Sequence, residues 1–222
     1  MKKTMLAISA AFAVVGAQAA TISAQDNLPI TQSTTEITVV SNLNKFDSAL
    51  GTLTGATLNI FGAATTTISL TNNAAQAQTA RATSFVNLAW SSLDAGIDAI
   101  LADDIAINFT TGAAQSYAVG QTRSFGPLTG DGTFSYDLSG VLAAITGAGS
   151  FGITCQSESG VTTLGGGGNV ASRQSTQAGC GAEIIYTFDA TPPPPRVPEP
   201  ASLALVGLAL AGVAAASRRR KA

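Results

Sequence analysis

The sequence contains no histidine, only two cysteines and few charged residues. Charged side chains account for 11% of the 222 residues. Without histidine, neither a Ser-His-Asp nor a Cys-His catalytic group can form, and the commonest general base at neutral pH is missing. Two thiols alone cannot complete a tetrahedral zinc site. We therefore expect no cofactor and no bound metal, and any acid–base reaction would have to depend on carboxylates.

Carboxylates are the groups left for acid–base chemistry or for calcium. A glycosidase needs two of them roughly 5–10 Å apart across a sugar, and no pair in the sequence has a recognisable setting. Asp103-Asp104 and Asp131-Gly132 are candidates for a calcium site in a loop, although the spaced acids of an EF-hand are missing. Solvated loop acids are the favoured interpretation of the whole set: Asp94, Asp98, Asp103, Asp104, Asp131, Asp137, Glu158 and Glu183.

Most basic residues lie near the two ends of the chain. The whole sequence has 11 basic and 13 acidic residues, whereas residues 20–197 have five basic and twelve acidic ones, a net charge of about −7. The five basic residues are scattered singly. A segment this acidic is a poor partner for nucleic acid or for an anionic membrane surface.

The first 19 residues have the pattern of a secretory signal peptide. Lys2 and Lys3 form a positive start, residues 5–15 are an apolar core, and Ala17-Gln18-Ala19 is a small-x-small cleavage site. The apolar run is shorter than the roughly 18–20 residues that a spanning helix needs, which argues against a permanent N-terminal anchor. We expect export by the Sec machinery and cleavage by signal peptidase after Ala19.

Short β-branched or apolar runs separated by Gly, Asn, Asp and Thr fill residues 34–190, after an irregular lead-in at residues 20–33. Period-two alternation turns one side chain inward and the next outward, so each strand buries one face. The pattern predicts a mainly β fold: one antiparallel β-sandwich or jelly-roll-like domain. Gly62-Ala63-Ala64 is interpreted as a break between two paired strands. The expected strands are 35–41, 56–62, 65–71, 104–110, 116–120, 132–138, 150–155 and 182–188.

The sequence predicts little helix and places the aromatic residues in the core. Short helices are expected within residues 85–104 and 139–147, where Gly96 weakens the first. Trp90 and the nine phenylalanines are interpreted as core residues rather than as a binding platform.

The two cysteines, Cys155 and Cys180, are predicted to form one disulfide, because the chain is exported to an oxidising compartment. Two buried free thiols are the alternative. A loop of this length gives about 3 kcal/mol in the chain-entropy model. Between the cysteines, residues 162–179 include Gly165–Gly168 but lack the Gly-Lys-Ser/Thr ending of a phosphate-binding loop. We predict a flexible surface loop there.

The C-terminal residues change character three times. Residues 191–197 are a proline-rich spacer, semi-rigid because consecutive prolines favour polyproline II. Residues 201–217 carry no charge and as a transmembrane helix would span about 25 Å, marginal against a hydrocarbon core of roughly 30 Å. The basic stub at residues 218–222 is predicted to be cytoplasmic by the positive-inside rule and comprises Arg218, Arg219, Arg220 and Lys221, before Ala222.

This order of Pro198-Glu199-Pro200, a short apolar helix and an Arg-rich end resembles the PEP-CTERM sorting signal of Gram-negative bacteria. The resemblance covers about the last 25 residues, 198–222. It implies recognition by exosortase, a membrane-embedded cysteine-dependent processing enzyme, with cleavage near Pro198, Glu199 and Pro200. It also implies an inner-membrane anchor with the body in the periplasm before processing, and then delivery to the cell surface or extracellular matrix of bacteria that make exopolysaccharide or biofilm.

A second resemblance concerns the body. Residues 45–62 and the closing residues 182–190 are similar to the choice-of-anchor E domain, which is found joined to alternative surface-anchoring tails. That family supplies no catalytic residues to transfer. The leading hypothesis is therefore a non-enzymatic surface or matrix protein, with exopolysaccharide as a candidate partner. A carbohydrate- or calcium-dependent binding module is the second hypothesis, and a polysaccharide hydrolase is the third.

Overall fold

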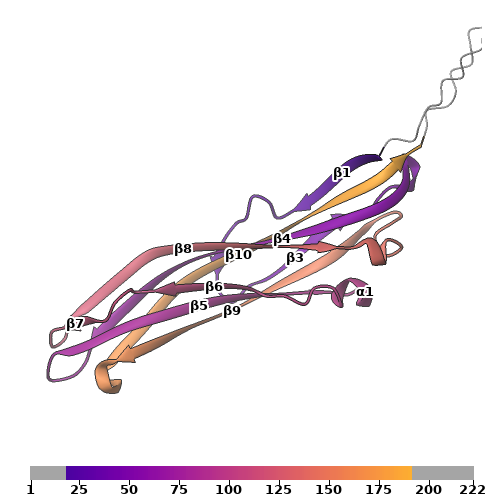
Figure 1. Ribbon diagram of the computed structural model, residues 1–222. Helices are drawn as coiled ribbons and strands as arrows, with labels where there is room; N and C mark the ends of the chain where they lie inside the picture. Colours follow the sequence, from indigo (N-terminus) through magenta and orange to yellow (C-terminus); the bar gives the residue numbers. More distant parts are fainter. Residues whose placement is uncertain (1–18, 192–222) are drawn as a thin grey trace, which may run out of the picture. The chain divides into compact units, whose positions relative to one another are not determined.

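The computed structural model describes residues 19–191, which form two antiparallel β-sheets with very little helix. Figure 1 shows their long strands running side by side. This confirms the predicted mainly β sandwich. The predicted signal-peptide residue Ala17, the sorting motif, the apolar stretch at 201–217 and the basic stub lie outside the described residues. Within residues 19–191, no helix is both long enough and apolar enough to cross a membrane.

The first sheet, sheet A, has five strands in the order β1-β10-β4-β8, with β2 also pairing with β10. All of its pairings are antiparallel. Its long central strands, β10 and β4, pair along nearly their whole length. The bounds are β1 (Ala19–Asp26), β2 (Ser33–Thr34), β4 (Gly51–Asn72), β8 (Thr122–Asp137) and β10 (Val170–Ala190).

The second sheet, sheet B, also has five strands, in the order β3-β9-β5-β6, with β7 pairing with β5. Its pairings are antiparallel too. The bounds are β3 (Thr38–Asn44), β5 (Gln78–Ser92), β6 (Ile105–Thr110), β7 (Gln115–Tyr117) and β9 (Ser150–Gly165). The helical turns are α1 (Ala95–Asp98), η1 (Ser48–Leu50), η2 (Ser139–Val141) and η3 (Gly166–Gly168).

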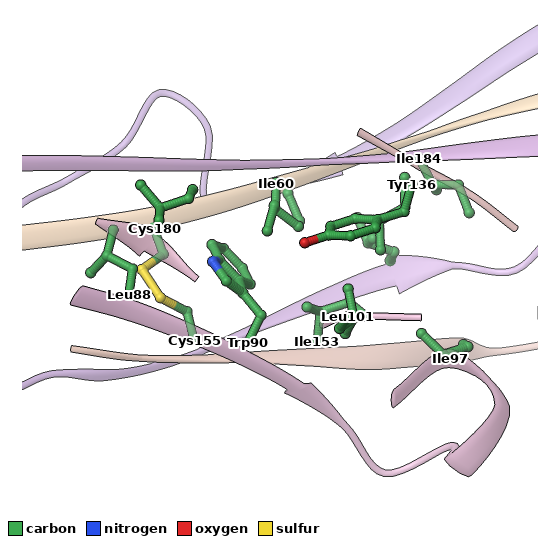
Figure 2. Packing of buried hydrophobic residues seen from close by; sticks show 14 of the residues in the cluster. Ile60, Leu88, Trp90, Ile97, Leu101, Tyr136, Ile153, Cys155, Cys180 and Ile184 are labelled. Carbon is green, nitrogen blue, oxygen red and sulfur yellow. A yellow bond between two sulfur atoms is a disulfide. The ribbon is translucent and has the colours of Figure 1, made fainter. Parts of the chain in front are cut away.

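The hydrophobic core lies between the two sheets, where alternate residues of each strand point inward. In β6 the buried residues are Ile105, Ile107 and Phe109, which confirms their predicted shared face. Trp90 is buried in the same cluster, as predicted, beside the disulfide (Figure 2). Tyr186 is 2% exposed, and its hydroxyl donates a hydrogen bond to the backbone oxygen of Asn44 at 2.7 Å.

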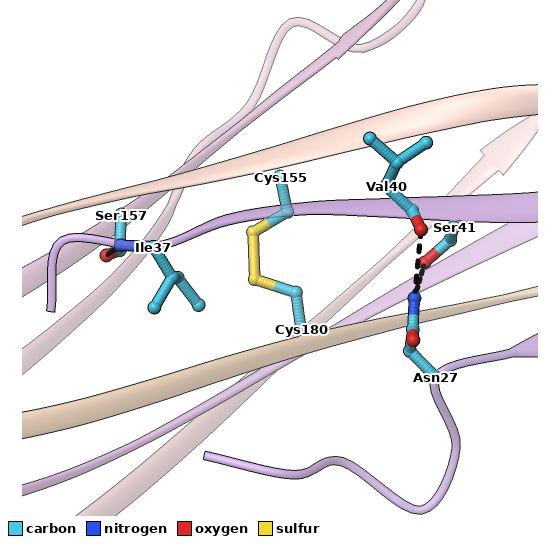
Figure 3. Close-up of a disulfide and its surroundings, with 7 residues drawn as sticks. All are labelled: Asn27, Ile37, Val40, Ser41, Cys155, Ser157 and Cys180. Carbon is cyan, nitrogen blue, oxygen red and sulfur yellow. Dashed lines mark hydrogen bonds between the residues drawn. A yellow bond between two sulfur atoms is a disulfide. The ribbon is translucent and has the colours of Figure 1, made fainter. Parts of the chain in front are cut away.

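The disulfide between Cys155 and Cys180 joins the two sheets and confirms the predicted pairing. Cys155 lies on β9 of sheet B and Cys180 on β10 of sheet A, with their Cα atoms 6.4 Å apart. Both side chains are buried. Figure 3 shows the bond crossing the core beside Ile37. The disulfide therefore connects the two layers from inside, instead of closing a surface loop.

Glycines next to this disulfide let the sheets approach closely. Gly62 of β4 lies between Cys180 of β10 and Gly132 of β8 in the sheet register. A Cβ atom at Gly62 would lie 2.2 Å from Cδ1 of Leu88, and one at Gly132 would lie 2.5 Å from Cγ2 of Ile105. Side chains of sheet B therefore occupy the space that these two residues leave empty.

Gly62 also explains one wrong prediction. The sequence predicts two strands separated at Gly62-Ala63-Ala64, but β4 runs unbroken from Gly51 to Asn72. These small residues do not form a turn: Gly62 accommodates Leu88, and Ala64 is fully buried. A glycine in a strand can mark a close approach as well as a break.

Two further predictions on irregular segments are wrong. The lead-in at residues 20–33 contains β1, whose local pattern is weak but which pairs with β10 along its whole length. Most of the predicted flexible loop at residues 162–179 forms paired β-strands, because β9 extends to Gly165 and β10 begins at Val170. Only the turn at Gly166–Gly168 is left. In both cases tertiary pairing overrides weak strand propensity.

Candidate functional site

The two ends of the described sandwich chain, residues 19 and 190, lie at the same end of sheet A. Ala19, after which the signal peptide is predicted to be cut, pairs with Asp189 near the end of β10. Ala190, the last residue of β10, pairs with Gly51 at the start of β4. Strands β1 and β10 therefore bring residue 19 and residue 190 to neighbouring positions in sheet A (Figure 1).

The proline run explains where β10 ends. Proline has no backbone N–H to donate to a β-ladder, and its ring restricts the residue before it. Pro192 to Pro195 follow Ala190 after a single threonine. Consecutive prolines therefore stop the ladder directly before the segment that contains the predicted sorting motif.

The predicted signal-peptidase bond lies within the β1 ladder. Ala19 pairs with Asp189 and Ala20 with Phe188, although β1 is an edge strand and the side chain of Ala19 is exposed. Signal-peptide cleavage at this bond requires a free backbone on both sides. Ala17, the other small residue of the predicted cleavage site, lies outside the described residues.

Several of the candidate carboxylates serve the fold. Asp94 accepts hydrogen bonds from the backbone N–H groups of Gly96 and Ile97, so it caps α1. Asp98 accepts one from the N–H of Ser92. The hydroxyl of Ser139, and secondarily its backbone N–H, hold the pKa of Asp137 below its usual value by hydrogen bonding to the carboxylate. These acids are local structural partners and do not gather into a site.

Asp104 and Glu158 do come together, in a polar hollow on the outer face of sheet B. The hollow is open to solvent and has a volume of about 300 Å³. Its lining also includes Glu36, whose carboxylate accepts a hydrogen bond from the N–H of Ser159. Within residues 19–191, no group of three His, Cys, Asp or Glu side chains is arranged to hold a metal ion. The complete lining is Glu36, Asn87, Ala89, Asp104, Gln156, Ser157 and Glu158.

A second hollow lies on the same sheet, next to Phe85. Phe85 is half-buried on the outward face of β5, in contrast to the prediction that the phenylalanines belong to the core. The hollow is open to solvent, has a volume of about 350 Å³ and is lined by Thr83, Ser84, Phe85, Asn108, Phe109 and Thr110. Sequence reasoning missed this group because the outward position of Phe85 is read only from the strand register.

Comparisons with known proteins identify one segment. Residues 196–221 match the family model described as the PEP-CTERM protein-sorting motif. This confirms the sorting signal predicted for residues 198–222, and such a signal implies export and membrane-anchored transit before processing by exosortase. The resemblance of the body to the choice-of-anchor E domain stays a prediction. A search of curated proteins gives no match.

One solved structure shows a weak likeness to the body. It is the "Structure of infectious bursal disease virus Gx strain", with 12% sequence identity and a TM-score of 0.16. The alignment covers 79% of this chain and 37% of that chain, so this chain spans well under half of its length. A likeness this low carries no argument about fold or function.

Proposed function

We propose that this chain is a non-enzymatic protein of the cell surface or extracellular matrix in a Gram-negative bacterium. Its C-terminal signal holds it in the inner membrane, with the sandwich in the periplasm, until exosortase cuts near Pro198-Glu199-Pro200. The observation that carries the proposal is the match of residues 196–221 to the PEP-CTERM sorting motif. After processing, the body associates with exopolysaccharide or biofilm, as its resemblance to a choice-of-anchor domain suggests.

The geometry of the body supports this role. Residue 19 and residue 190 lie on neighbouring strands, so the two predicted membrane-directed segments leave the sandwich from one end. Residues 192–197 lie outside the described residues; as the predicted proline-rich spacer, the seven residues 191–197 would span about 22 Å in polyproline II, at about 3.1 Å per residue.

A carbohydrate-binding role is the second candidate, and the hollows on sheet B favour it over calcium binding and hydrolysis. The outward Phe85 stands beside amide and hydroxyl side chains, a combination suited to sugars. Against a calcium site, no three acidic side chains within residues 19–191 are close enough together to hold a metal ion. Hydrolysis would have to use Asp104 and Glu158, the two predicted carboxylates that share one hollow.

The sorting proposal is tested by changing the motif. We expect the double variant Pro198→Ala, Glu199→Ala to accumulate as a larger, membrane-retained form, because exosortase no longer recognises it. Fractionation of the exporting bacterium and mass spectrometry of the recovered protein measure retention and both cut ends.

The matched control is the double variant Pro193→Ala, Pro194→Ala, which changes the spacer and keeps the motif. This control is expected to be processed normally. Normal processing and release of the motif variant would overturn the sorting proposal.

A further inference from the structure

We propose that the outer face of sheet B binds a neutral polysaccharide chain, with the ring of Phe85 as the stacking platform. This inference deepens the proposed matrix role by naming a ligand class and the residues that bind it. It depends on the arrangement of side chains on three neighbouring strands: β6, β5 and β9.

Phe85 is placed as a flat aromatic surface on the sheet. It lies in the middle of β5, opposite Asn108 of β6 on one side and Gly160 of β9 on the other. A Cβ atom at Gly160 would lie 2.5 Å from Cε1 and 2.8 Å from Cζ of the Phe85 ring. The ring therefore covers the backbone of Gly160, and Phe85 as a whole stays only half-buried. An aromatic ring held this way offers apolar surface to the C–H groups of a sugar.

Polar groups surround this ring. Asn108 is exposed, and Thr83 and Asn87 occupy the neighbouring outward positions of β5. Within residues 19–191, the side chains of Thr83, Asn87 and Asn108 make no hydrogen bond to other protein groups. Amides both donate and accept, so they pair with the hydroxyl groups of a sugar.

The two hollows of sheet B share no lining residue but follow one another along β5. The hollow beside Phe85 begins at Thr83, and the polar hollow includes Asn87 and Ala89. Six residue steps of a strand correspond to about 20 Å. The face is therefore long enough for a chain of several sugars, and it presents an aromatic ring near one end and hydrogen-bond acceptors near the other.

The charges at the polar hollow favour a neutral ligand over an acidic one, whereas the other end of this face carries one basic side chain, Arg81, exposed on β5. Glu36, Asp104 and Glu158 line the polar hollow, and their carboxylates would repel an acidic polysaccharide while accepting hydrogen bonds from hydroxyls. A protein partner is less suited, because the centre of a protein interface is apolar and depleted of charged groups. Here a single ring is bordered by amides, hydroxyls and carboxylates.

The outer face of sheet A is built differently. Leu28 and Ile30 lie over Gly181 and Gly179 of β10, so part of that face is covered by the chain itself. Phe61 of β4 is also half-buried and outward, opposite Gly181. Phe61 therefore supplies a matched control for Phe85: the same residue type, similar burial and a central strand, but on the other sheet.

The test is affinity electrophoresis of the exported protein in native gels that contain hydroxyethylcellulose, soluble starch, dextran or, as the acidic probe, alginate. We expect at least one neutral polysaccharide to retard the protein and alginate to retard it less. Phe85→Ala is expected to weaken binding by about tenfold, the effect of one lost aromatic contact. Asn108→Ala is expected to weaken it too, whereas Phe61→Ala binds as the wild type does.

Urea unfolding of the three variants shows whether each is folded. The proposal is overturned if no neutral polysaccharide retards the wild type, or if folded Phe85→Ala binds as tightly as Phe61→Ala. Stronger retardation by alginate would also overturn it. None of these results bears on processing at Pro198-Glu199-Pro200, so the sorting proposal stands or falls separately.

Discussion

At the scale of single residues, the disulfide is the feature with the clearest energetic role. Cys155 and Cys180 are separated by 25 positions and join the two sheets. We expect the variant Cys155→Ala, Cys180→Ala to lose about 3 kcal/mol of the free energy of unfolding, because the unfolded chain regains the freedom of that loop. Urea unfolding measures the loss.

The control for this prediction is the same measurement with a reducing agent. Reductant should lower the unfolding midpoint of the wild type and leave that of the double variant unchanged. A double variant as stable as the wild type would show that the core alone holds the layers together.

Tyr186 makes stability depend on alkaline pH. Burial raises the pKa of its hydroxyl well above the ordinary value near 10. Above about pH 10 the unfolded chain therefore loses this proton first, so the free energy of unfolding falls as pH rises toward the raised pKa. Burial also raises the pKa values of Tyr117 and Tyr136, which add to the fall.

We expect Tyr186→Phe to flatten this fall without removing it. Urea unfolding at pH 8 and pH 11 measures the slope for both proteins. At pH 8 the variant is expected to be less stable, because the hydrogen bond to Asn44 is lost. Equal slopes for the two proteins would contradict the assignment to Tyr186.

At the scale of strands, Gly62 is a position where the two sheets come into close contact. A methyl group there would meet Leu88, which is fully buried. We expect Gly62→Ala to cost about 1–3 kcal/mol of the free energy of unfolding, because the extra carbon overfills a packed core. Chemical unfolding measures the cost.

Gly152→Ala is the matched control for this substitution. Gly152 is also in a strand, but a Cβ atom there would lie 3.5 Å from Cγ1 of Val40, an ordinary contact. This control is expected to be nearly neutral. Equal stability of the two alanine variants would contradict the close contact between Gly62 and Leu88.

The strands also show what the sequence could and could not predict. Alternating Ile105, Ile107 and Phe109 predicted β6 correctly, because a period of two directly reflects one buried face. β4 was predicted as two strands, because small residues suggest turns when their neighbours across the core are unknown. The disulfide was predictable from export and cysteine number. Phe85 was not, since its exposure depends on which residues of β6 and β9 flank it.

At the scale of the whole described body, charge is divided between its two ends. The hairpin end, residues 67–84, 107–126 and 161–175, contains Arg81, Arg123 and Arg173 but no acidic residue. All twelve acidic residues of the body lie in its other part, where Lys45 is the one basic residue within residues 19–191. An anionic membrane surface therefore repels the part that contains Ala19 and Ala190, over a distance of about 8 Å at physiological salt.

The position of β10 in sheet A bears on the timing of folding. β10 is the last strand of the body along the chain, yet it lies between β1 and β4 and contributes Cys180. In a chain that crosses the membrane from its N-terminus, β1 cannot pair with β10 until β10, which ends at residue 190, has crossed. Cleavage at the predicted signal-peptidase site after Ala19 would then act on a backbone that is still unpaired. For such a chain we expect the predicted signal-peptide cleavage to come first, and sheet A to be completed only as the sorting signal arrives at the membrane.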